Sequence, residues 1–155
     1  MTHELHAEMT LPQSVDRVFE FFSDAGNLER ITPPELGFQI LTPRPIAMAP
    51  GALIDYQLRL FGLRFRWRTR ITSWDPPHRF VDEQLRGPYA EWIHTHTFAP
   101  VGDGTRITDH VRYRLPLFPI GQLGYPVVRL QLARIFSYRQ SVIRQLLAAP
   151  SVAAS

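Results

Sequence analysis

Residues 127–147, with the sequence VVRLQLARIFSYRQSVIRQLL, form one long stretch of helical periodicity near the C-terminus. At about 100° per residue, one face of a helix through this stretch is apolar apart from a single arginine. The apolar residues of that face are Val128, Leu132, Ile135, Phe136, Val142, Ile143 and Leu146. The opposite face carries Arg134, Ser137, Ser141, Arg144 and Gln145. The pattern predicts a long amphipathic helix around which the rest of the fold is organised.

The arginine on the apolar face is Arg139, which projects between Ile135 and Ile143. A guanidinium keeps its proton, so inside a protein it needs an anion, a set of acceptors or water in a cavity. Two interpretations remain open: an internal ion pair with a carboxylate on a facing strand, or a position in the wall of a ligand pocket. With either interpretation we expect Asp109, Asp82 or Glu83 within hydrogen-bonding reach of Arg139.

The length and composition indicate one domain with a sizeable core and exclude several kinds of site. The 155 residues are 45% hydrophobic and 20% charged, which is typical of a globular protein. The chain has no cysteine and no lysine, because all 17 basic residues are arginine. Disulfides, thiolate nucleophiles, Schiff-base lysines and Walker-type phosphate loops are therefore excluded. We expect a single domain over residues 1–148 and a flexible tail over residues 149–155.

The charge pattern favours neither a membrane span nor nucleic acid. No apolar run is long enough for an integral membrane segment, and residues 1–10 lack the features of a signal peptide, so a cytoplasmic location is expected. The net charge is only +3. Arg64, Arg66, Arg68 and Arg70 alternate with apolar residues, which is the pattern of a solvated outer strand face rather than of a nucleic-acid or anionic-surface site.

The rest of the chain reads as strands with two short helical segments. Residues 5–11 form a weak strand pattern, residues 14–22 have helical periodicity, and residues 27–31 form a further turn before two prolines. From residue 51 the apolar period changes to two, with turn residues between the runs. The expected strands span residues 38–41, 54–60, 63–74, 79–86, 91–98 and 105–115. The order predicts an α+β fold in which a curved antiparallel sheet of about seven strands wraps around the C-terminal helix.

This order of elements resembles the helix-grip fold of START-like proteins, also called the SRPBCC superfamily, which includes polyketide cyclases. Nearly the whole chain is similar, and the sequence resembles most closely a bacterial group of uncharacterised ligand-binding members. The stretches that carry the resemblance are Asn27-Leu28 with Ile31-Thr32-Pro33-Pro34, Gly51 with Ile54-Asp55-Tyr56, Asp82-Glu83-Gln84 with Gly87-Pro88-Tyr89, Trp92 to Phe98, and Ile135-Phe136 with Tyr138-Arg139. The resemblance implies a hydrophobic pocket rather than a particular reaction.

Candidate site residues come mainly from the strand at residues 91–98. Trp92, His94, His96 and Phe98 are two apart and share one face, which we expect to point inward. Asp109 on the next strand should lie near the histidines. On the preceding strand, the register decides whether Asp82 and Gln84, or Glu83, face the same space. Tyr56, Trp67 and Tyr113 are expected to be core or cavity lining.

Three roles for the histidines remain open. A His-x-His strand pair with a carboxylate can bind a metal, but spacing fixes no third ligand, so neither metal nor cofactor is expected. Either histidine could act with Asp109 as a general acid or base. A structural network of hydrogen bonds is the third alternative. It is the favoured one, because most buried polar side chains in proteins are hydrogen-bonded to one another or to the backbone.

The leading functional hypothesis is binding of a small hydrophobic or amphipathic molecule in a cavity between sheet and helix. Arg139, His94, His96, Trp92, Asp109, Tyr56, Trp67 and Tyr113 are the expected ligand-binding residues. An enzyme of cyclase, aromatase or dehydratase type, using cavity His and Asp as acid and base, is the alternative. A third alternative is an interaction module with a filled core and an external partner. The sequence leaves the existence of a homodimer open and names no catalytic residue.

Overall fold

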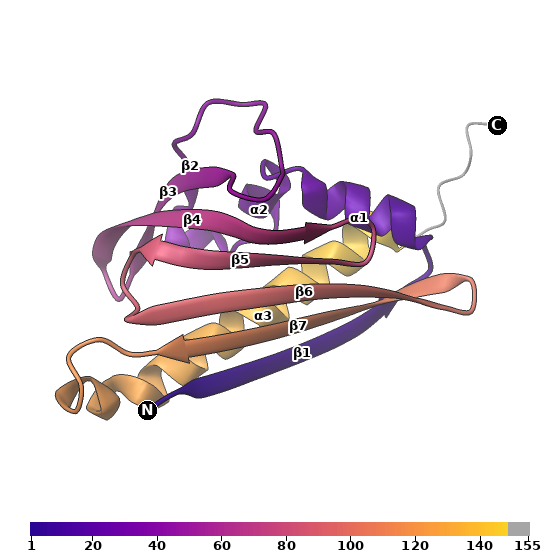
Figure 1. The fold of residues 1–155 in the computed structure, drawn as a ribbon. Coiled ribbons are helices and arrows are strands. Elements are labelled where there is room, and N and C mark those ends of the chain that lie inside the picture. Colours follow the sequence, from indigo (N-terminus) through magenta and orange to yellow (C-terminus); the bar gives the residue numbers. More distant parts are fainter. Residues whose placement is uncertain (149–155) are drawn as a thin grey trace.

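The computed structural model describes residues 1–148, so the predicted tail at 149–155 lies outside the described residues. Figure 1 shows one sheet with a long helix, α3, running diagonally across one of its faces. The strands are β1 (His3–Leu11), β2 (Gln39–Ile40), β3 (Leu53–Leu60), β4 (Leu63–Asp75), β5 (Arg79–Arg86), β6 (Glu91–Val101) and β7 (Gly104–Arg114). The helices are α1 (Val15–Ser23), α2 (Asn27–Arg30), the 3-10 helices η1 (Pro34–Leu36) and η2 (Ile120–Gly124), and α3 (Tyr125–Leu147).

The seven strands form one antiparallel sheet in the order β1-β7-β6-β5-β4-β3-β2. Consecutive strands from β2 to β7 are neighbours, and the first strand pairs with the last, which confirms the predicted helix-grip architecture. The register between β4 and β5 shifts twice, after Arg68 and after Ile71. Such irregularities increase the bend of a sheet, and here they help it curve around α3.

The buried face of α3 is close to the predicted one. Leu132, Phe136 and Ile143 are buried, while the predicted polar face is exposed. The helix begins two residues earlier than expected because Pro126 fits in a first turn, where its missing N–H costs nothing. The assignment of Leu146 to the buried face was wrong, since Leu147 is buried and Leu146 is 37% exposed. Residue 147 lies about 40° from Ile143 around the helix and residue 146 about 60°, on the other side.

The core consists of two apolar clusters with a polar layer between them. The first joins α1 to the C-terminal part of α3 and includes Phe19, Phe98 and Ile143. The second includes Trp92, Val111 and Phe136. Along β6, β7 and α3 the chain therefore passes from one apolar cluster to the other, and it crosses polar residues on the way. We call Asp82, His94, His96, Asp109 and Arg139 the polar layer.

The short helix α1 closes one end of the sheet. Ser14 caps it by accepting a hydrogen bond from the backbone N–H of Arg17 at 3.3 Å, and Val18 and Phe19 are buried. The Phe19 ring packs edge-on against Phe98 at 5.3 Å between centroids.

Within residues 1–148, no helix combines the length and the apolar character that a bilayer span requires.

The packing of α3 predicts the effect of truncating its buried side chains. Leu132 is 2% exposed, whereas Leu130, on the opposite side of the same helix, is 73% exposed. Leu132→Ala should lower the free energy of unfolding by about 2–5 kcal/mol, because it leaves a cavity. Leu130→Ala should change it by no more than about 0.5 kcal/mol. Urea unfolding of both variants checks this, and equal losses would mean that the buried face of α3 is wrongly assigned.

Candidate functional site

A cavity of about 140 Å³, partly open to solvent, lies between α3, the concave face of the sheet and the α1–α2–η1 segment. Most of its lining is apolar and aromatic, with Phe38, Ile54, Leu58, Phe80, Leu132 and Phe136 among the contributors. Four residues of the polar layer, Asp82, His94, His96 and Arg139, also line it. A cavity of about this volume accommodates one aromatic ring. An apolar space with a few converging polar groups is the usual form of a small-molecule site.

The histidines and aspartates of the polar layer are connected diagonally across three strands. In the backbone register His94 lies opposite Asp82 on β5, and His96 lies opposite Asp109 on β7. The hydrogen bonds run the other way: His94 Nε2 donates to Asp109 Oδ1 at 2.8 Å, and His96 Nε2 donates to Asp82 Oδ2 at 2.6 Å. The two imidazole rings stack with their centroids 3.7 Å apart. Each carboxylate is thus satisfied by the histidine that is diagonal to it.

Burial and hydrogen bonding set the charges of this network. Burial opposes ionisation of Asp109, but the hydrogen bond from His94 and the nearby positive charges outweigh it and lower its pKa to about 2. Burial also opposes ionisation of Asp82. The hydrogen bond from His96 and the nearby positive charges outweigh it and lower the pKa of Asp82 below its ordinary value. Burial is the largest cause of a lowered pKa at His96, and repulsion from His94 is the second. The hydrogen bond to Asp82 raises this pKa but does not outweigh them. At neutral pH both carboxylates are therefore ionised and His96 is neutral.

Arg139 occupies the cavity wall without an ion pair. The predicted hydrogen bond to Asp109, Asp82 or Glu83 was wrong: within residues 1–148 no carboxylate lies within ion-pair distance of Arg139. The two buried carboxylates, of Asp109 and Asp82, accept hydrogen bonds from His94 and His96 instead. The guanidinium carbon lies 4.9 Å from the centroid of the Phe136 ring, a cation–π contact, and its charge still lowers the pKa of both aspartates.

Three buried polar atoms on cavity-lining residues have no hydrogen-bond partner. They are Nε of Arg139, Nε1 of Trp67 and Nδ1 of His96. The first two are N–H donors. Because His96 uses its Nε2–H toward Asp82, its Nδ1 carries a lone pair and can accept. An unsatisfied buried donor costs about 1–3 kcal/mol, which a ligand with acceptor oxygens would recover.

The structure brings most of the predicted site residues together. Arg139, His94, His96, Trp92, Tyr56 and Trp67 line the cavity. Asp109 lies behind His94 and outside the lining, and Tyr113 is buried in the second apolar cluster, so neither belongs to the cavity surface. Of the acidic residues left open by the sequence, Asp82 faces the cavity. Tyr89 was missed, although its position after the Gly87-Pro88 turn returns it to the cavity wall beside Trp92.

The donor set of Asp82, His94 and His96 is chemically suited to a metal ion. Their ligand atoms lie within 4.8 Å of one another, so the folded chain supplies the third ligand that sequence spacing could not fix. In this arrangement, however, a carboxylate already holds one nitrogen of each imidazole, and a metal would have to replace those hydrogen bonds. That no metal is required stays a prediction.

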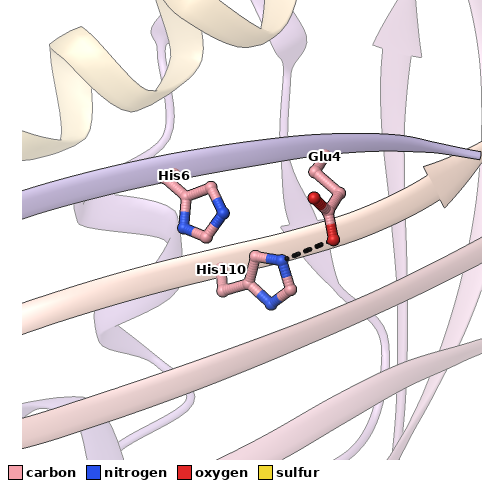
Figure 2. A group of neighbouring side chains, drawn as sticks. All are labelled: Glu4, His6 and His110. Carbon is pink, nitrogen blue, oxygen red and sulfur yellow. Dashed lines mark hydrogen bonds and ion pairs between the residues drawn. The ribbon is translucent and has the colours of Figure 1, made fainter.

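A second histidine cluster lies on the outer face of β1 and β7, away from the cavity. Figure 2 shows Glu4, His6 and His110 there, with the His110 Nε2 to Glu4 Oε1 contact of 3.3 Å drawn as a dashed line. His6 and His110 face each other across the strands, and their rings stack 4.4 Å apart. Arg112 is the cross-strand partner of Glu4, and its guanidinium pairs with Glu91 at 3.6 Å. The ligand atoms of the three residues lie within 4.8 Å of one another, so the cluster has the donors of a metal site, but Glu4 and His6 are exposed to solvent.

The lowered pKa of His96 predicts that the fold loses stability in mild acid. The unfolded chain binds a proton at His96 near pH 6.5, whereas the folded chain resists it, so the stabilisation is present above that pH and is lost below it. The contribution of Asp109 has the same sign but is lost lower, between about pH 3.8 and about pH 2. The free energy of unfolding should therefore fall between pH 7.5 and 5.5, and fall less steeply in His96→Gln. Identical pH profiles for the two proteins would contradict the assignment.

Comparison with known proteins agrees with the fold. Residues 2–145 match the family model described as polyketide cyclase / dehydrase and lipid transport. TTHA0849 from Thermus thermophilus is 19% identical over 99% of this chain and 100% of its own, with a TM-score of 0.76. A START superfamily protein from Mycobacterium smegmatis is 14% identical over 94% of this chain and 97% of its own, with a TM-score of 0.70.

A plant protein gives a more distant structural likeness. Ginseng major latex-like protein 151 from Panax ginseng is 12% identical over 96% of this chain and 99% of its own, with a TM-score of 0.66. No curated protein matches the sequence significantly. At these identities the solved structures show the fold alone, and the family model covers nearly the whole chain. The chain belongs to the polyketide cyclase / dehydrase and lipid transport family and has the START-like, SRPBCC fold.

Proposed function

We propose that the protein binds a small amphipathic molecule in the cavity, with its apolar body against the aromatic lining and an anionic or carbonyl group on Arg139. The observation that carries the proposal is the buried Nε–H of Arg139, which has no partner and belongs to a cavity-lining residue. Trp67 offers a second free N–H in the same cavity. Together they favour a ligand with acceptor oxygens rather than a pure hydrocarbon.

The electrostatics favour an anionic group at Arg139 only. Asp82 and Asp109 are ionised, so a carboxylate placed beside them would be repelled. Their charges are already engaged by the histidines, whereas Arg139 has no ion pair within residues 1–148. The cavity volume of about 140 Å³ suits a molecule built on one aromatic ring. An aromatic monocarboxylate such as benzoate is therefore the simplest probe.

The binding experiment compares benzoate with neutral phenol in the wild-type protein and two arginine variants. Arg139→Met should weaken benzoate binding at least about tenfold, since a charge-assisted hydrogen bond contributes about 1.5–3 kcal/mol, and should leave phenol binding within about twofold. Arg144→Met, at an exposed position of the same helix, should change neither. Quenching of the cavity tryptophans, Trp67 and Trp92, reports binding. Equal weakening of both probes by Arg139→Met, together with a loss of stability, would show that Arg139 is structural.

A second candidate function, acid–base catalysis of the cyclase or dehydratase type, is favoured by one specific observation. His96 lines the cavity and is held through Nε2 by Asp82 at 2.6 Å, while its Nδ1 lies 3.5 Å from Asp109 Oδ1 and makes no hydrogen bond. Its lowered pKa keeps the lone pair available at neutral pH. An imidazole oriented by a carboxylate is the usual arrangement of a general base. Nδ1 could take a proton from a carbon next to a carbonyl whose developing negative charge Arg139 would stabilise.

Proton exchange tests this candidate without knowledge of the natural substrate. Cyclohexanone in D2O should exchange its α-hydrogens faster with the wild-type protein than with His96→Gln, because Gln cannot accept a proton. The rate should fall in acid, at a pH below the ordinary histidine value of 6.5, as His96 becomes protonated. His110→Gln, which changes only the surface histidine, is the control. Equal exchange by wild type and His96→Gln would remove the catalytic candidate and leave binding alone.

A further inference from the structure

An apolar tip projects from the molecule between the end of β7 and the first turns of α3. Six large side chains there are exposed: Leu117 80%, Phe118 68%, Ile120 72%, Leu123 83%, Val127 54% and Leu130 73%. In Figure 1 this segment lies at the lower left, past the end of β7. Monomeric proteins rarely expose contiguous apolar surface of this kind without a partner for it. We call these six residues the apolar tip.

The tip is organised as a helical stripe. η2 continues directly into α3, and Ile120, Leu123, Val127 and Leu130 recur three, four and three residues apart. That spacing places them on one face, opposite the buried Leu132, and the face becomes polar at Arg134. The apolar stripe is therefore confined to the projecting end of the helix. It serves no packing within the described chain.

The backbone also holds Leu117 outward at a cost. Leu117 has a φ of 59°, in the left-handed region that L-residues other than glycine and asparagine avoid. A strained conformation that presents a leucine 80% exposed is not explained by packing, since nothing in residues 1–148 covers the side chain. Phe61, in the β3–β4 turn, has a similar φ of 54°, so the strain alone does not distinguish the tip, and the exposed helical stripe and the charge carry the argument.

The charged residues that flank the tip in sequence are all arginine. The sequence contains no Asp or Glu after Asp109, whereas Arg112, Arg114, Arg129 and Arg134 flank the tip in sequence. Arg112 and Arg114 share the single carboxylate of Glu91, each at 3.6 Å. Arg129 is exposed and, within residues 1–148, lies in no ion pair. Arg134 pairs with Glu35 at 3.0 Å, so the four arginines share two carboxylates and leave an excess of positive charge beside the tip. Apolar side chains bordered by an excess of cations match the headgroup and acyl layers of an anionic lipid surface.

We propose that the apolar tip docks the protein on anionic lipid bilayers. The exposed leucines, isoleucine and phenylalanine enter the boundary between headgroups and acyl chains, and the arginines lie against the lipid phosphates. Another protein would be expected to meet cations with acidic side chains, and a nucleic acid would not bury this apolar stripe. The proposal extends the proposed function, because the helix that carries the tip continues into the cavity wall at Leu132, Phe136 and Arg139.

Cosedimentation of the full chain with vesicles tests this docking. Wild-type protein should bind vesicles of 7:3 phosphatidylcholine and phosphatidylglycerol at least about tenfold more strongly than pure phosphatidylcholine. Phe118→Ser with Leu123→Ser should reduce binding to the anionic vesicles at least about tenfold, and Arg129→Gln about fivefold. Phe61→Ser with Leu63→Ser is the matched control, since those residues are 56% and 63% exposed on the β3–β4 hairpin. That control variant should bind like wild type.

Three results would overturn the docking. The first is equal binding by the tip variant and the hairpin variant. The second is no preference of wild type for the anionic vesicles. The third is a wild-type dimer in light scattering that the tip variant converts to a monomer without vesicle binding, which would make the tip a contact between two copies. Unchanged thermal unfolding of the tip variant, expected for exposed positions, shows that folding is intact. Arg139→Met should bind vesicles normally, so that failure of the cavity proposal is distinguishable from failure of docking.

Discussion

The structure depends on placing two carboxylates, two imidazoles and one guanidinium in the middle of an otherwise apolar core. Burying such groups is costly unless each finds a partner, and a half-satisfied network is worse than an apolar core. The partners here come from β5, β6 and β7, which lie side by side in the sheet. A shift of one residue in any of these registers would turn His94, His96 or an aspartate to the outer face. The network therefore favours one register and one orientation of the sheet.

The same constraint explains why this layer and not the surrounding core forms the candidate site. The apolar clusters on either side are closely packed, with Phe98 and Val111 fully buried. The polar layer between them is not filled by apolar side chains. Two of its own polar atoms, on Arg139 and His96, and Nε1 of the neighbouring Trp67 have no hydrogen-bond partner. Binding and catalysis make different demands on these atoms. Binding needs the donors of Arg139 and Trp67, whereas catalysis also needs the free nitrogen of His96.

Much of the fold could be predicted because periodicity records which face of an element is buried. The alternation from Trp92 to Phe98 gave the correct inward face, and the helical period of residues 127–147 gave the helix to within two residues at its start. The side of β5 that faces the cavity could not be predicted, because residues 82–84 are polar on both faces. Nor could the partner of Arg139. The sequence shows that a buried charge needs a partner. Only the diagonal geometry shows that both carboxylates accept their hydrogen bonds from the histidines and not from Arg139. The exposed tip was missed because the prolines and glycines of residues 116–126 indicate a connector, so its apolar residues were not grouped with Val127 and Leu130 on the helix.

The central claim is that Arg139 is held without an ion pair so that it can receive the polar group of a cavity ligand. The measurement that tests it most directly is a crystal structure of the protein soaked with benzoate. The account predicts the ring against Phe136 and Trp67, and a carboxylate oxygen within about 2.7–3.2 Å of the Arg139 guanidinium. Benzoate bound only outside the cavity, or Arg139 turned into bulk solvent with the cavity collapsed, would contradict it.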